Sequence, residues 1–220
     1  MTFNQFVNNY NGKAIDYDGG SGVQCVDLIK LYMDKVLLIT PHAIGNAHCY
    51  FDDFYSHEFL KQNFDRIANS PSFVPAKGDI CVWGLNFSKY GHVAIATGEG
   101  SKNYFYSYDQ NWGIKNMHKV FHDYKGFAGV LRTKKQYLLF DNPSNQDYLL
   151  GVENMKTYVN GSTPEPVYSD SNCTNKIGEL NPRETCSCLG IKEEKAIVFY
   201  KVTNSNNHKI GFVKWLGGVH

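Results

Sequence analysis

The spacing of apolar residues changes along the chain and separates a helical region from a strand-rich one. Apolar side chains recur at helical spacing over residues 26–38, and Pro41 closes that segment. A second, partly helical segment is expected over residues 50–69, with Phe51, Phe54, Phe59 and Leu60 facing inward, before Pro71 and Pro75 break the chain.

The period becomes two after Gly78, which predicts β-strands. Alternating apolar residues bounded by Gly and Asn turns predict strands at residues 79–83, 92–97, 104–108 and 127–132. No helix alternates with these strands, as a parallel sheet would require. The pattern therefore predicts an α+β domain in which N-terminal helices pack on an antiparallel sheet.

A second domain is expected after residue 152. Residues 1–133 form the first domain and residues 134–152 a linker with weak periodicity. Short strands separated by Gly, Asn and Pro then predict a small all-β barrel over residues 153–220. The expected strands are 156–159, 166–168, 176–180, 196–201 and 209–213.

Composition narrows the classes of function. Of the 220 residues, 42% are hydrophobic and 20% charged, and the formal net charge is +1. These values fit a folded chain and give no electrostatic basis for nucleic-acid binding. We see no secretory signal over residues 1–10 and no apolar run long enough to span a bilayer, so no membrane partner is expected. The six cysteines are sparse for this length and are expected to be reduced thiols.

Four residues together suggest nucleophilic catalysis. Cys25 lies at the predicted N-terminus of the first helix, where backbone N–H groups favour a thiolate. His92 opens a strand, and Asp109 and Asn111 follow the next strand on one side, where either could orient the imidazole. Taken singly, such residues are more often a buried thiol, a structural histidine and a turn. Their combination favours an acyl-transfer site with Cys25 as nucleophile and His92 as base.

The loop before Cys25 is a candidate cation site. Hard cations such as calcium take carboxylate and backbone carbonyl oxygens from a tight loop. In this loop, such oxygens could come from the side chains or backbone carbonyls of Asp16, Asp18, Gly20, Gly22 and Asp27. The alternative is an ordinary Asp/Gly turn in which Asp27 complements the helix dipole, and spacing alone favours that turn.

Three blocks resemble the signatures of the CHAP domain, the cysteine, histidine-dependent amidohydrolase/peptidase family that cuts peptidoglycan. The blocks are Gln24-Cys25-Val26-Asp27-Leu28, Gly91-His92-Val93-Ala94-Ile95 and Asp109-Gln110-Asn111-Trp112. The resemblance covers roughly residues 1–133 and is strongest to endolysins of phages that infect Gram-positive bacteria. It implies a papain-like α+β fold. Residues 153–220 are loosely similar to bacterial SH3-type wall-binding barrels, with no ligand-binding residue identified.

The resemblance also implies roles for individual residues. Cys25 would be the nucleophile, His92 the base, and Asp109 and Asn111 the orienting pair. Many relatives have Glu where this chain has Asp109, which leaves open which of the pair holds the imidazole. The backbone N–H of Cys25, with Gln24, would bind the oxyanion.

Some relatives bind calcium through a loop that matches this one in register. The resemblance therefore favours a structural calcium ion at Asp16, Asp18, Gly20, Gly22 and Asp27.

The implied function is a phage endolysin that hydrolyses an amide of the stem peptide or cross-bridge in a Gram-positive wall through a thioester. It leaves open an N-acetylmuramoyl-L-alanine amidase or an endopeptidase. Alternatives are a host or virion-associated hydrolase of the same chemistry and a non-catalytic wall-binding protein on a decayed hydrolase scaffold. The expected product is a monomer made in the host cytoplasm without a signal peptide, reaching the wall after holin-mediated release.

Overall fold

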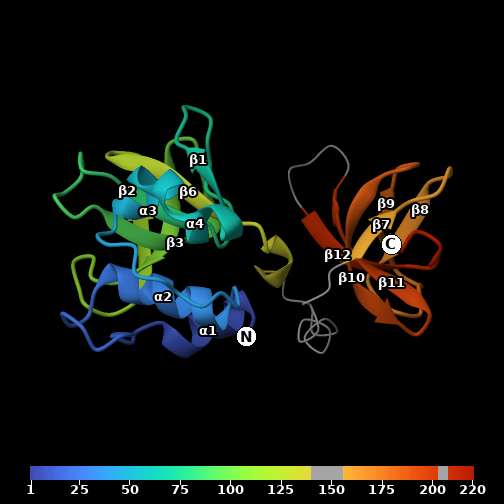
Figure 1. The fold of residues 1–220 in the computed structure, drawn as a ribbon, viewed down its shortest axis with the longest axis horizontal. Helices are drawn as coiled ribbons and strands as arrows, with labels where there is room; N and C mark the ends of the chain where they lie inside the picture. The colour runs from blue at the N-terminus through green and yellow to red at the C-terminus, as the bar shows by residue number, and fades with distance from the viewer. Residues whose placement is uncertain (140–155, 203–207) are drawn as a thin grey trace. The chain divides into compact units, whose positions relative to one another are not determined.

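The computed structural model describes residues 1–139, 156–202 and 208–220 (Figure 1). The chain divides into two compact units, Met1–Leu139 and Phe140–His220. Within the described residues, no helix combines the length and apolar character needed to cross a membrane. All six cysteines are free thiols.

The first unit is built on a six-stranded antiparallel sheet with the order β1-β6-β2-β3-β4-β5. Strand β2 lies inside the sheet, and all four of its residues are buried. The strands are β1 (Phe64–Ala68), β2 (Ile80–Trp83), β3 (His92–Ser101), β4 (Tyr104–Asp109), β5 (His118–His122) and β6 (Phe127–Thr133).

Helices cover one face of this sheet and form the larger core with it. Helix α2 packs against β3, α3 against β6 and α4 against β1 (Figure 1), while α1 contacts α2 through Phe6 and Tyr32, whose ring centroids lie 5.6 Å apart. The helices are α1 (Phe3–Tyr10), α2 (Cys25–Lys35), α3 (Cys49–Asp52), the 3-10 turn η1 (Phe54–Ser56) and α4 (Glu58–Asn63).

Strand alternation gives the sheet a second apolar face. Ile80 and Val82 of β2 join the helix-covered core, whereas Cys81 and Trp83 join a separate aromatic cluster with Phe105. Because side chains alternate along β3 as well, Val93 belongs to the helical core and His92 projects towards Trp83. The start of β3 therefore lies beside an aromatic environment.

The four strands expected in this unit are confirmed, and the remaining elements differ in instructive ways. Helix α2 ends at Lys35 rather than Leu38, because Leu38 has a left-handed φ of 52°. The segment 50–69 is helical only to Asn63 and then becomes β1. The periodicity did not predict α1 or β5, which are short and leave few side chains buried.

The first unit also extends past the expected boundary at residue 133. A 3-10 turn, η2 (Gln136–Leu139), follows β6, and Leu138 and Leu139 are buried. Leu139 joins the core beneath the helices, so residues 134–139 belong to the first unit rather than to a linker. The rest of the expected linker lies outside the described residues.

The second unit is a six-stranded antiparallel sheet with the order β7-β10-β11-β12-β8-β9. Its core includes Tyr158, Val198 and Tyr200. The five expected strands are confirmed, and β10 is an additional one. The strands are β7 (Lys156–Val159), β8 (Glu165–Tyr168), β9 (Lys176–Leu180), β10 (Thr185–Lys192), β11 (Lys195–Lys201) and β12 (His208–Val213).

Candidate active site

Three element ends bring the predicted catalytic residues together. Cys25 is the first residue of α2, His92 the first of β3 and Asp109 the last of β4. Gly91 makes the entry to β3 possible, because its φ is 69° and a Cβ there would lie 2.4 Å from the Trp83 carbonyl oxygen. His92 is therefore presented at the end of the sheet immediately after a turn that only glycine fits.

His92 and Asp109 form a buried pair. His92 Nε2 lies 2.8 Å from Asp109 Oδ2, and the two residues are 4% and 0% exposed. Because Asp109 occupies Nε2, Nδ1 is the ring nitrogen that remains to interact with Cys25, which acts on the charge of His92. The three side chains thus form a nucleophile–base–orienter chain.

Electrostatics favour a protonated His92 in this arrangement. Burial alone lowers the pKa of His92, but hydrogen bonds and charges of Asp109 and Cys25 outweigh it and raise the pKa to about 9. Burial also raises the pKa of Asp109, yet hydrogen bonds from His122 and His92 reverse this and leave its pKa below the usual value. At neutral pH the pair is therefore an imidazolium beside a carboxylate.

Two further donors to Asp109 were not predicted from the sequence. His122 Nε2 lies 3.2 Å from Oδ1 and 3.1 Å from Oδ2, and the Ser107 hydroxyl donates to Oδ1. Ser107 shares the inward face of β4 with Asp109, so strand alternation could have indicated it. His122 lies on β5, a strand that the hydrophobic pattern did not reveal.

Aromatic rings enclose this polar group. Trp83 lies 5.4 Å from His92 and 4.6 Å from His122 between ring centroids, and Trp112 lies 4.8 Å and 4.6 Å from the same rings. Trp112 also stacks on Phe87 at 5.0 Å. The rings reduce the access of water, which strengthens the hydrogen bonds to Asp109.

Cys25 and His92 open into a cavity of about 660 Å³. Asn111 is exposed on the wall of this cavity, and its backbone has a left-handed φ of 60°. His92 Nε2 donates its hydrogen bond to Asp109 Oδ2, so the structure separates the two residues of the expected orienting pair. The cavity is lined by Gln24, Cys25, Val26, Gly45, Asn46, Ala47, Phe87, Ser88, Tyr90, Gly91, His92, Asn111, Trp112 and Gly113.

The start of α2 offers donors for an oxyanion. The Cys25 amide lies in the first helical turn, whose N–H groups have no acceptor within the helix. The Gln24 amide instead donates to Asp27 Oδ2 at 2.8 Å. Gln24 can therefore contribute to an oxyanion site through its side chain, but not through its backbone N–H.

Gln110 joins the loop before Cys25 to the end of β4. Its Oε1 accepts the Ile15 N–H at 2.8 Å, and its Nε2 donates to the carbonyls of Ile15 and Gln24 at 2.8 Å and 2.6 Å. Gln110 is fully buried. Because its neighbour Asp109 holds His92, this one side chain fixes Gln24 and Cys25 relative to the histidine.

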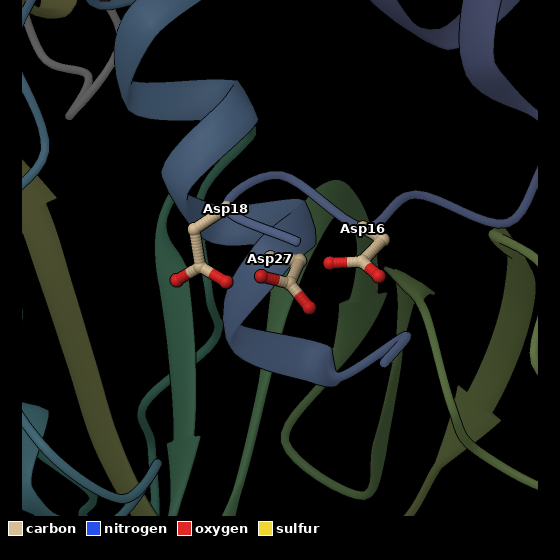
Figure 2. A group of neighbouring side chains, drawn as sticks. All are labelled: Asp16, Asp18 and Asp27. Carbon is tan, nitrogen blue, oxygen red and sulfur yellow. The ribbon is translucent and has the colours of Figure 1, made fainter. Parts of the chain in front are cut away.

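The predicted cation loop brings three carboxylates together. Oxygen atoms of Asp16, Asp18 and Asp27 lie within 4.8 Å of one another, and Figure 2 shows Asp27 between the other two, beside the first turn of α2. The Lys30 ammonium bonds to Asp18 and lies 3.9 Å from Asp27 Oδ1. Oxygen donors of this kind suit calcium, and Lys30 offsets part of their charge. Gly20 belongs to the same loop and donates its N–H to Asp18 Oδ1.

The segment that carries this site matches a known protein family. Residues 15–111 match the family model of the CHAP domain, a range that contains every predicted catalytic and cation-binding residue. The chain is 27% identical to endolysin PlyTW of Staphylococcus phage Twort over 97% of its own length, and it spans 46% of that protein. The first unit therefore contains a CHAP domain, and the chain is homologous to a staphylococcal phage endolysin.

The chain is also similar to solved structures. The wild-type endolysin LysIME-EF1 is 31% identical with a TM-score of 0.50, covering 60% of this chain and 64% of that one. Ly7917 covers 97% of this chain at 15% identity and a TM-score of 0.41, a likeness too low to carry an argument.

Proposed function

We propose that the chain is an endolysin-type peptidoglycan hydrolase that cleaves an amide of a Gram-positive wall. The observation that carries this proposal is the Cys25–His92–Asp109 arrangement at an open cavity inside the segment that matches the CHAP domain. The homology to a phage endolysin supports the substrate class. On this proposal the α+β first unit is papain-like, with the nucleophile on a helix N-terminus and the base on the sheet.

The geometry supports a thioester mechanism. The His92 imidazolium stabilises the Cys25 thiolate, whose Sγ attacks the amide carbonyl carbon. The oxyanion accepts hydrogen bonds from the Cys25 backbone N–H and the Gln24 side chain. His92 then donates its proton to the amine nitrogen, the C–N bond breaks and a thioester remains. His92 next takes a proton from water, whose oxygen attacks the thioester; the acid leaves and the thiolate–imidazolium pair returns.

The substrate amide belongs to the stem peptide or to the cross-bridge. Both N-acetylmuramoyl-L-alanine amidases and endopeptidases would use these residues. Mass spectrometry of digested peptidoglycan distinguishes them, because a newly freed amino group identifies the cleaved bond. We expect soluble fragments from wild-type protein and none from Cys25→Ala.

Cys49→Ala is the matched control, since Cys49 is another half-buried thiol but does not line the cavity. It should digest peptidoglycan like the wild type. Undiminished release of fragments by Cys25→Ala would remove the mechanism.

We assign the second unit to wall binding as an SH3-like domain. Its compact antiparallel sheet, with a core of its own, supports this assignment. Trp215 is 42% exposed and is thus available to a ligand, whereas Tyr158 and Tyr200 are buried. The full chain carrying Cys25→Ala should sediment with purified Gram-positive walls without digesting them. Protein that stays in the supernatant would contradict wall binding.

We also propose a structural calcium ion at the Asp16–Asp18–Asp27 cluster. The three carboxylates fit such an ion, with carbonyl oxygens of Gly20 and Gly22 as further ligands. Asp27 carries the effect towards the active site, because its Oδ2 already fixes the Gln24 amide next to Cys25. The ion would hold the loop in place and supply no atom to the reaction.

The proposed site of action is the wall of the host, reached from the cytoplasm. The homology to a phage endolysin supports this route.

A further inference from the structure

We propose that His122 is a positioning residue that holds Asp109 in the orientation required by the Cys25–His92 pair. This proposal rests on the proposed function, since it adds a fourth side chain to the same catalytic chain. His122 lies outside the segment 15–111 that matches the CHAP domain, and nothing in the hydrophobic pattern of residues 118–122 indicates it.

Three side chains donate hydrogen bonds to the Asp109 carboxylate. His92 donates to Oδ2, Ser107 donates to Oδ1, and His122 Nε2 is placed between the oxygens at 3.2 Å and 3.1 Å. A carboxylate held at both oxygens has lost the freedom to rotate about its terminal bond. Oδ2 therefore remains directed at the His92 ring, whose other nitrogen is left for Cys25.

Both Asp109 and His122 are buried. Asp109 is completely buried and His122 is 4% exposed, so water does not replace a lost donor easily. The rings of Trp83 and Trp112 lie 4.6 Å from the His122 ring, and Phe105, its partner in the β4–β5 register, lies at 5.5 Å. Removal of the His122 N–H would take away one of the hydrogen bonds that stabilise the negative charge of the buried Asp109 carboxylate.

The charges around Asp109 and His92 show how the loss of the His122 hydrogen bond would change the protonation of His92. Asp109 faces His92, His122 and Ser107, and its charge also acts on the buried Cys81 thiol of β2. His92 faces Asp109 and Cys25. When His122 no longer donates, Asp109 takes up a proton more readily, its hydrogen bond to His92 weakens, and the His92 imidazolium loses its main support.

The alternative is that His122 only fills space among the aromatic rings. The two roles differ in what a substitution does. His122→Gln retains a side-chain N–H donor, whereas His122→Phe retains an aromatic ring without one. His118→Phe is the matched control, because His118 lies on the same strand but its Nδ1 meets the Asn116 carbonyl instead.

The first test needs no variant and no substrate. Nitrogen NMR of the wild-type full chain identifies the protonated ring nitrogens of each histidine. We expect His122 to carry a proton on Nε2 at neutral pH, as a donor to Asp109 must. A His122 that is protonated on Nδ1 alone would overturn the proposal.

The second test follows the His92 titration in the variants. We expect His122→Phe to lower the His92 pKa by at least one unit and to slow alkylation of Cys25 by iodoacetamide at pH 7 at least tenfold. His122→Gln should stay close to the wild type, and His118→Phe should not differ from it. If His122→Phe does not fold, the protonation of His122 Nε2 in the wild type and the His92 titration in His122→Gln test the proposal instead.

Other outcomes overturn the proposal. An unchanged His92 titration in folded His122→Phe would leave His122 a packing residue, and so would equal damage in His122→Gln and His122→Phe. Both readouts are independent of peptidoglycan. A wild-type chain that shows these effects but digests no wall would therefore contradict the proposed function and not the role of His122. With active protein, kcat should fall in His122→Phe while KM stays within about twofold.

Discussion

His92 and Asp109 lie 17 positions apart in the chain, yet their side chains meet at 2.8 Å beside the rings of Trp83 and Trp112. This leaves Nδ1 of His92 for Cys25, and both residues line the cavity. Asp109 therefore orients the His92 ring from within the sheet, while Cys25 and His92 lie at the cavity.

This geometry predicts different costs for the two candidate orienting residues. Asp109→Asn should lower kcat/KM by about 10²-fold or more, because the amide cannot support the imidazolium as a carboxylate does. Asn111→Ala should cost less than about tenfold, because Asn111 is exposed on the cavity wall. The measurement is wall digestion by purified variants of equal thermal stability. A larger loss in Asn111→Ala would transfer the orienting role to Asn111.

The raised pKa of His92 predicts an alkaline limit. Since the imidazolium donates the proton to the leaving amine, activity should fall as the pH rises through about 9. Stability should follow in the same direction. A His92 pKa above its unfolded value of about 6.5 stabilises the fold fully below that pH and loses the contribution as the pH passes about 9.

The measurement is a pH profile of kcat/KM together with urea unfolding at several pH values. His92→Gln should remove the alkaline decline in stability that belongs to this group. A profile that is flat from pH 7 to 10 would contradict the assignment.

Calcium is expected to stabilise the chain through the Asp16–Asp18–Asp27 cluster. Addition of calcium should raise the Tm and EGTA should lower it, because the ion binds the folded loop. Asp18→Asn should abolish the shift. Lys30→Met should bind calcium more tightly than the wild type, since the competing ammonium beside Asp18 is removed.

Scanning calorimetry and calcium titration measure both effects, and magnesium serves as the control ion. A Tm that responds to neither calcium nor EGTA would dismiss the ion. If Lys30→Met and the wild type bind calcium with equal affinity, the Lys30 ammonium does not compete with the ion.

Gln110 should be a stability determinant that also affects catalysis. Gln110→Leu leaves the Ile15 N–H and two carbonyls without their buried partner, so the free energy of unfolding should fall by about 3 kcal/mol. Gln62→Ala, at an exposed position, should change it by less than about 0.5 kcal/mol. Chemical denaturation of both variants decides. Equal stability would show that Gln110 does not hold the loop.

The hydrophobic pattern predicted β2 and β3 because each begins with a run of buried residues, and the sheet has an apolar core on both faces there. It missed β5, whose residues alternate between half-buried and exposed until His122. The chain order of Cys25, His92 and Asp109 indicated the catalytic set. Their fourth neighbour, His122, could not be found, since its contact with Asp109 arises only from the pairing of β4 with β5.

The domain boundary predicted at residue 133 was too early for a related reason. Two leucines after β6 carry too little periodicity to predict an element, yet both are buried, and Leu139 completes the core beneath the helices. The cation loop differs again, because spacing alone did not separate a turn from a site. The structure brings its three carboxylates within 4.8 Å, and Lys30, a helical turn beyond Asp27, was not expected among them.

The activation of Cys25 by His92 is tested most directly by alkylation of the full chain at pH 7, followed by mass mapping of all six cysteines. Cys25 should react first, and His92→Gln should slow its reaction at least tenfold while the other cysteines keep their rates. A Cys25 that stays unlabelled in the folded wild type, or that reacts equally fast without His92, would contradict the catalytic pair.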